Sequence, residues 1–125
     1  MNIIIYGGDK LDLIEIFKVL GDENRIRIFN LLTKGVFCVC RIETVLGMNQ
    51  SNTSRHLNRL KSAGIITCEK KSQWVYYKIN NKFIEENKLL YDFLKNKLAE
   101  NPRCLEDIER LNNDAAIDLA CDKLT

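Results

Sequence analysis

The sequence predicts a mainly α-helical fold that carries one β-hairpin, and three observations support this class. Apolar residues recur at helical spacing over most of the 125 residues. An alternating stretch rich in β-formers lies just past the middle of the chain. Glycines and a proline stand where the helical patterns stop. The hydrophobic content of 46% suits one compact domain with a single core.

The first two helices are expected on either side of Gly21. Apolar residues recur at helical spacing over residues 13–20, and Gly21 ends that pattern. Asp22 is the expected N-cap of a second helix, which ends at Gly35.

The next two helices are expected to be joined by a tight turn. The first runs from about Cys38 to Leu46 and stops at Gly47. The second runs from Gln50 to Ala63, with Gly64 as its C-terminal cap. Two short helices with such a turn predict a helix-turn-helix.

The hairpin follows directly. Residues 65–68 and 74–79 are rich in β-formers and flank a polar turn at residues 70–73. Alternation along the second strand predicts three residues that face the core: Val75, Tyr77 and Ile79. The hairpin would be the wing of a winged helix-turn-helix.

Two helices are expected after the wing, a long one over residues 83–98 and a last one that begins at Asn101-Pro102. Asn101 would be the N-cap of the last helix, and Pro102 would take its first helical position. We assign residues 9–100 to the winged helix-turn-helix domain and residues 101–125 to a C-terminal helix at a dimer interface. The terminal helices offer more apolar surface than one small winged domain can bury, which predicts a homodimer. The apolar residues expected there are Leu13, Ile16, Phe17, Leu90, Phe93 and Leu94.

Charge is distributed unevenly along the chain. Residues 49–82 hold seven Lys or Arg residues against one Glu, a net charge of +6, while twelve basic and sixteen acidic residues leave −4 elsewhere. A basic segment in an otherwise acidic protein indicates a surface for nucleic acid, because phosphates attract lysine and arginine. An ordinary solvated face would also explain the charge.

Cysteine content and the N-terminus predict a cytoplasmic protein with no membrane association. The first residues lack the basic stretch and cleavage site of a secretion signal, and no stretch of the sequence is long and apolar enough to span a bilayer. Five cysteines form no even framework of disulfides: Cys38, Cys40, Cys68, Cys104 and Cys121. In a reducing cytosol they would remain thiols and be available to metals.

Four motifs in register carry a family resemblance over roughly positions 12–100. They are Leu20–Phe29, Gln50–Leu57 with Leu60–Ile66, Trp74–Tyr77, and Cys38-Val39-Cys40. Together they resemble the ArsR/SmtB family of metal-sensing repressors, in particular its arsenic-sensing members. The resemblance implies a repressor that binds double-stranded operator DNA as a homodimer and releases it when a metalloid binds.

The same resemblance identifies Cys38 and Cys40 as ligands of the inducer, As(III) or Sb(III), because soft ions of this kind prefer thiolates. No organic cofactor is expected. Arg41 and Glu43 stand where other sensors have an aspartate and a third cysteine, so the third ligand stays open among Cys68, Cys104 and Cys121. The lone histidine of the chain disfavours zinc and nickel.

Helical geometry adds a mechanism to this expectation. Side chains two residues apart point about 200° apart around a helix, so an intact helix cannot direct both sulfurs at one atom. We therefore expect chelation to unwind or shift the start of the helix that contains Cys38 and Cys40.

The expected DNA surface combines the second helix of the helix-turn-helix with the wing. From the helix we assign Gln50, Ser51, Asn52, Ser54, Arg55, His56 and Arg59, and from the wing Lys70, Lys71 and Gln73. His56 is expected to contact DNA, since no second histidine could complete a zinc site.

Two other functions remain open from the sequence. Cys38 and Cys40 could form a disulfide as a thiol redox switch, or the protein could be a ligand-blind winged-helix adaptor that binds another protein. Enzymatic activity is not expected, because no serine or cysteine has an evident paired base.

Overall fold

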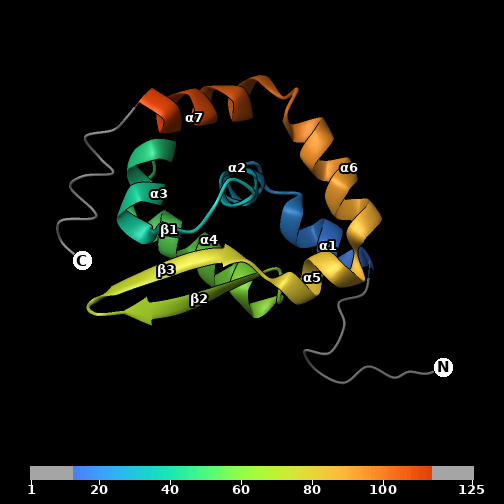
Figure 1. Cartoon of the computed structure of the whole chain (residues 1–125), viewed down its shortest axis with the longest axis horizontal. Helices are drawn as coiled ribbons and strands as arrows, with labels where there is room; N and C mark the ends of the chain where they lie inside the picture. The colour runs from blue at the N-terminus through green and yellow to red at the C-terminus, as the bar shows by residue number, and fades with distance from the viewer. Residues whose placement is uncertain (1–12, 114–125) are drawn as a thin grey trace.

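A computed structural model describes residues 13–113 and confirms the mainly helical fold with a hairpin (Figure 1). In chain order the elements are α1 (Leu13–Leu20), α2 (Glu23–Leu32), β1 (Phe37–Cys38), α3 (Val39–Leu46), α4 (Gln50–Ser62), β2 (Ile66–Lys71), β3 (Trp74–Ile79), α5 (Asn81–Glu86), α6 (Lys88–Leu98) and α7 (Pro102–Asn113). No helix within these residues is long and apolar enough to cross a membrane.

Helix α2 lies at the centre of the domain. Figure 1 shows it end-on, surrounded by the other helices and by the sheet. Its last six residues, 27–32, are all buried, and it packs against α1, α3, α4, α7 and β3. Phe29 makes edge-to-face ring contacts with Phe83 and Tyr91, at centroid distances of 6.3 and 6.1 Å. The core therefore forms around α2, and the elements that carry candidate sites are positioned by it.

The helix caps follow the expected chemistry. The Asp22 carboxylate accepts hydrogen bonds from the backbone N–H groups of Asn24 and Arg25, at 2.9 and 3.1 Å, and so begins α2. Gly47 ends α3 with a φ of 68°, in the left-handed region that favours glycine. Asn49 then caps α4 through its side-chain oxygen, which accepts from the Asn52 N–H at 2.8 Å.

The sheet has one strand more than expected. Its order is β1-β3-β2, with both pairs antiparallel, and Phe37 and Cys38 pair with Tyr77 and Tyr76. A two-residue strand has no periodicity to detect, which is why the sequence placed Cys38 in a helix. The prediction for the second hairpin strand was right for Ile79, which is buried, and for Tyr77, which is half-buried and packs against the core. Val75 is only half-buried.

The expected long helix over residues 83–98 is two helices, α5 and α6. The break lies at Asn87, whose φ of −133° and ψ of 42° are not helical. The Asn87 side chain donates a hydrogen bond to the Phe83 carbonyl at 3.1 Å. Asparagine competes with helical backbone bonding in this way, and the apolar period alone does not reveal it.

Helix α7 packs on α2 and α3 of the same chain. Its start is as expected, since the Asn101 side chain accepts from the Cys104 N–H at 3.0 Å. Residues 114–125, including the rest of the expected last helix, lie outside the described part of the chain. A boundary after residue 100 and a role of the last helix in dimerisation stay predictions.

Candidate DNA-reading helix and thiol pair

The segment from α3 to α4 forms a helix-turn-helix. Gly47 in the left-handed conformation turns the chain out of α3, and the Asn49 cap starts α4 three residues after α3 ends. The two helices pack directly on each other. Val45 and Leu46 of α3 and Leu57 and Leu60 of α4 are all buried, so the core fixes the angle at which α4 is presented.

One face of α4 is available to a ligand as large as DNA. Gln50, Ser51 and Arg55 are exposed, and Asn52 and Ser54 are half-buried. The Arg55 guanidinium donates to the Asn52 side-chain oxygen at 3.0 Å, which holds two polar side chains together on this face.

The predicted set omitted Asn58, which is exposed on the same face of α4. It follows Ser54 by four residues and Arg55 by three, the spacing of neighbours on one side of a helix. That spacing was visible in the sequence and would have included Asn58.

His56 does not lie on the exposed face, so the structure corrects its assignment as a DNA contact. Its side chain is 3% exposed and lies between α4 and the start of α2. Nδ1 is 3.4 Å from an Arg25 guanidinium nitrogen, and Nε2 is 4.0 Å from the Asp22 carboxylate. Burial, aided by the positive charges of Arg55 and Arg25, lowers the pKa of His56 although Asp22 opposes this. A buried neutral imidazole joins α4 to α2 and cannot reach a base edge.

Arg59 has a partner within the protein. Its guanidinium donates to the Glu15 carboxylate of α1 at 2.7 Å, and both side chains are partly exposed, at 41% and 35%. The pair ties α4 to α1, so a contact from Arg59 to a phosphate would compete with Glu15.

The wing presents two lysines and a glutamine. Lys70, Lys71 and Gln73 are exposed. Lys70 and Lys71 lie in β2 opposite Val75 and Trp74, so they belong to a strand and not to the expected turn. The turn itself is shorter and includes Ser72 with a φ of 60°.

The two predicted sensor cysteines are brought together. The sulfur atoms of Cys38 and Cys40 are 3.2 Å apart, with Cys38 at 2% exposure and Cys40 half-buried. Cys38 is the extended N-cap of α3, with a φ of −76° and a ψ of 161°. The sequence argument that a helix would point the sulfurs apart was wrong, because only Cys40 is helical. No unwinding of α3 is needed for both sulfurs to reach one atom.

Within residues 13–113, no third cysteine, histidine or carboxylate joins this pair to form a metal cluster. In the sheet, Tyr77 of β3 pairs with Phe37 of β1 on one side and with Cys68 of β2 on the other. Cys38 pairs with the neighbouring residue, Tyr76. Side chains alternate along a strand, so Cys68 lies on the opposite face of the sheet from Cys38.

The other two candidate ligands are no better placed in the described structure. Cys104 is buried in α7 at 2% exposure, and burial raises the pKa of its thiol. Cys121 lies outside the described residues. The third ligand therefore stays open.

Comparisons with known proteins agree with this geometry. Residues 22–67 match the family model described as bacterial regulatory protein, arsR family. The arsenic resistance transcriptional regulator ArsR2 of Pseudomonas putida is 35% identical over 94 residues, which cover 74% of this chain and 79% of that protein. ArsR1 of the same organism is 41% identical over 66 residues, and this match spans 52% of either protein, about half of its length.

Among solved structures, the homodimeric winged helix-turn-helix DNA-binding domain of Mb0332 from Mycobacterium bovis is similar with a TM-score of 0.58 and 26% identity. The match covers 72% of this chain and 84% of that domain. The winged helix-turn-helix predicted from the sequence is thus confirmed.

Proposed function

Because the chain belongs to the ArsR family of bacterial regulatory proteins, we propose that it is a repressor that binds double-stranded operator DNA as a homodimer. We further propose that it dissociates from the DNA when As(III) or Sb(III) binds Cys38 and Cys40. The observation that carries the proposal is the 3.2 Å separation of the two sulfurs at the start of α3. Helix α3 packs on α4, so the thiol pair and the DNA-reading face share one structural unit.

The two sulfurs are close enough to chelate one thiophilic ion, and the number of thiolates suits a pyramidal metalloid better than zinc. With a metal–sulfur bond of about 2.3 Å, as in zinc thiolates, the 3.2 Å separation corresponds to an S–M–S angle of about 90°. Tetrahedral zinc needs about 109° and four ligands. Trivalent arsenic and antimony keep a lone pair and bind three donors at angles much nearer 90°. Cys38 and Cys40 would supply two of those donors.

DNA binding would use the exposed face of α4 in the major groove and the wing lysines on the flanking backbone. Gln50, Ser51, Asn52, Ser54 and Arg55 lie on the available face, with Asn58 added by the structure. Lys70 and Lys71 supply positive charge for phosphates, and Gln73 lies beside them.

Coupling between the thiol pair and the DNA-reading face of α4 would depend on how the C-terminal end of α3 is held. The Leu46 carbonyl accepts from Arg27 at 2.7 Å, and the Val45 carbonyl accepts from Arg110 at 2.6 Å. With its C-terminal end fixed in this way, a pull of the third ligand on an ion held by Cys38 and Cys40 would tilt α3 rather than slide it. A metalloid needs only to bind the tilted state more tightly than the DNA-bound state.

Dimerisation would bury the apolar residues that the protomer leaves exposed on α1 and α6. Leu13, Ile14 and Phe17 are 55–68% exposed, and Leu89 and Phe93 are 86% and 56% exposed. The structure corrects one residue of the predicted interface, because Ile16 is 1% exposed in the core of its own protomer. Leu90 and Leu94 are half-buried. Several large apolar side chains left exposed on two helices are typical of subunit interfaces.

The test is arsenite-dependent release from labelled operator DNA. We expect Cys38→Ser and Cys40→Ser to bind DNA like the parent protein and to lose the response to arsenite. Cys68→Ser is the matched control, since its thiol lies on the other face of the sheet, and it should respond fully. Full response of both Cys38→Ser and Cys40→Ser would place the sensor elsewhere, and no release of the parent protein would favour the ligand-blind adaptor.

The same sulfur separation favours one second candidate, a thiol redox switch. Loss of two hydrogen atoms to an oxidant such as peroxide would join the sulfurs, which must approach from 3.2 Å to a bond of about 2.05 Å. Mass spectrometry of the protein released from DNA separates the two functions. A loss of two hydrogens under peroxide with release of DNA, and no release by arsenite, would establish the redox switch.

A further inference from the structure

A second candidate ligand site lies beside helix α2. It is a partly enclosed cavity of about 110 Å³ between the end of α2, the end of α6 and the start of α7. Leu98 of α6 and Leu105 and Ile108 of α7 form an apolar wall. At about 30 Å³ for a water-sized group, the cavity encloses roughly four non-hydrogen atoms, and because it is only partly enclosed the end of a slightly longer chain can extend from its mouth.

Asn30 contributes a buried donor with no partner. The residue lines the cavity at 4% exposure, and its amide nitrogen Nδ2 makes no hydrogen bond. Leaving such a group unsatisfied costs about 1–3 kcal/mol, so a buried amide of this kind indicates a missing acceptor. An oxygen atom of a bound molecule would satisfy it.

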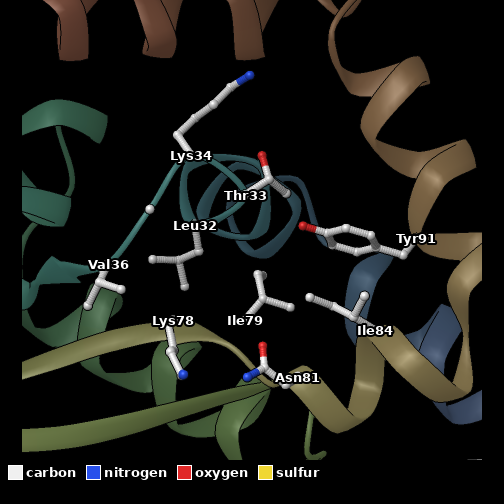
Figure 2. Close-up of a pocket in the computed structure, with 10 residues that line it drawn as sticks. Leu32, Thr33, Lys34, Val36, Lys78, Ile79, Asn81, Ile84 and Tyr91 are labelled. Atoms are coloured by element: carbon white, nitrogen blue, oxygen red, sulfur yellow. The ribbon is translucent and has the colours of Figure 1, made fainter.

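The charged side chains that line the cavity are both lysines. Lys34 and Lys95 line it, and no carboxylate does. Figure 2 shows the neighbouring open groove beneath α2, with Lys34 pointing away from that groove and upward past Thr33. Cys104 also lines the cavity, and burial raises the pKa of its thiol, so it adds no negative charge.

From these features we propose that the cavity binds a short-chain aliphatic carboxylate, with butyrate close to the upper size limit. One carboxylate oxygen accepts from Asn30 Nδ2, the negative charge faces Lys34 and Lys95, and the alkyl chain lies against Leu98 and Ile108. An inorganic oxyanion would satisfy the charges but leave the apolar wall uncovered, which is why the alkyl chain is part of the proposal.

Such a ligand would stabilise the docking of α7 on α2. Asp107 of α7 binds Arg27 of α2. The two cavity residues Cys104 and Asn30 each lie one helical turn from this pair, Cys104 on α7 and Asn30 on α2. The cavity is therefore the next layer of the same α2–α7 interface. This inference does not depend on metalloid sensing.

The first experiment titrates the full chain with sodium butyrate, followed by NMR of the Asn30 side-chain amide and by thermal unfolding. We expect saturable shifts of the Asn30 amide and of Cys104, and a rise in melting temperature. Butyramide has the same shape without the charge and should bind at least about tenfold more weakly. Equal effects of butyrate and butyramide, an equal effect of inorganic phosphate, or no saturation would each overturn the proposal.

Variants locate the binding. Asn30→Leu removes the donor and leaves an apolar residue in a buried position, so it should fold, and it should weaken butyrate binding about tenfold or more. Asn81→Leu, in the neighbouring groove, makes the same chemical change and should bind butyrate normally. The double variant Lys34→Met and Lys95→Met should lose binding, whereas Lys97→Met should retain it, since Lys97 does not line the cavity. Unchanged affinity in Asn30→Leu would exclude this site.

Discussion

Arg27 of α2 and Asp107 of α7 form a two-point ion pair inside the protein. Arg27 Nε and Nη2 donate to the two carboxylate oxygens, each at 2.9 Å, and the side chains are 4% and 0% exposed. Asp107 also accepts from Arg110 at 2.6 Å. Because Arg27 and Arg110 both bind the last carbonyls of α3, the pair connects the C-terminal helix to the helix-turn-helix.

Replacement of Asp107 by alanine should lower the free energy of unfolding by about 3–5 kcal/mol, because it leaves the buried Arg27 charge without its counterion. Urea denaturation measures this change. Asp92→Ala is the matched control, since its pair with Lys88 is exposed and should contribute about 0–1 kcal/mol. Similar losses in the two variants would show that burial of the Arg27–Asp107 pair is not what matters.

Thiol reactivity should separate Cys40 from Cys104. Cys104 is 2% exposed and burial raises the pKa of its thiol, whereas Cys40 is half-buried. In the folded protein, iodoacetamide should therefore modify Cys40 at least about tenfold faster than Cys104, as followed by peptide mass spectrometry. In urea the two rates should converge. Rapid modification of folded Cys104 would contradict its burial in the core.

Alanine substitution on the exposed face of α4 should separate base contacts from phosphate contacts. Arg55→Ala and Asn58→Ala should each weaken operator binding by about 1–3 kcal/mol if they read bases, with lower preference for the operator over random DNA. Lys71→Ala should weaken binding to all sequences alike and reduce the salt dependence by about one unit of slope. Titration at several salt concentrations measures both effects. Normal operator binding in all three variants would remove α4 and the wing from the interface.

Stability should depend on pH through His56, the chain's only histidine. Burial lowers the pKa of His56 from its ordinary value of 6.5. Below about pH 6.5, His56 is therefore protonated to a greater extent in the unfolded chain than in the folded protein. The free energy of unfolding should accordingly be highest above this pH and fall as the pH drops.

The pH effect can be assigned by mutation. His56→Gln should have lower pH dependence of the unfolding free energy between about pH 6.5 and 5. The Asp22 carboxylate contributes below this window. Desolvation raises the pKa of Asp22, but the backbone N–H of Arg25 and the charge that His56 carries once it is protonated lower this pKa on balance. Identical pH profiles of His56→Gln and the parent protein would contradict the assignment.

Dimerisation should be lost when charge is introduced on α6. Phe93 is 56% exposed, and Phe93→Lys should shift the protein toward a monomer in sedimentation at micromolar concentration, because an interface cannot bury an unpaired ammonium without cost. Val36 is equally exposed, at 54%, but lies beside the sheet, so Val36→Lys should leave the assembly unchanged. A dimeric Phe93→Lys, or a monomeric parent protein, would argue against this interface.

Much of the fold follows from local patterns in the sequence. The caps at Asp22 and Gly47 and the alternation around the wing depend on neighbours within a few residues, and these elements appear where they were expected. The break at Asn87 escaped prediction because the apolar period continues across it.

The sequence by itself thus determined the winged helix-turn-helix and the presence of a Cys-Val-Cys motif before its reading helix. Tertiary structure alone decided what each side chain contacts. His56 lies on the inner face of α4, where its imidazole contacts Asp22 and Arg25. Both residues lie more than thirty positions away along the chain. Cys38 lies near Cys40 because pairing with Tyr76 holds it in an extended strand. Both outcomes depend on contacts between residues distant in sequence, which spacing and periodicity cannot specify.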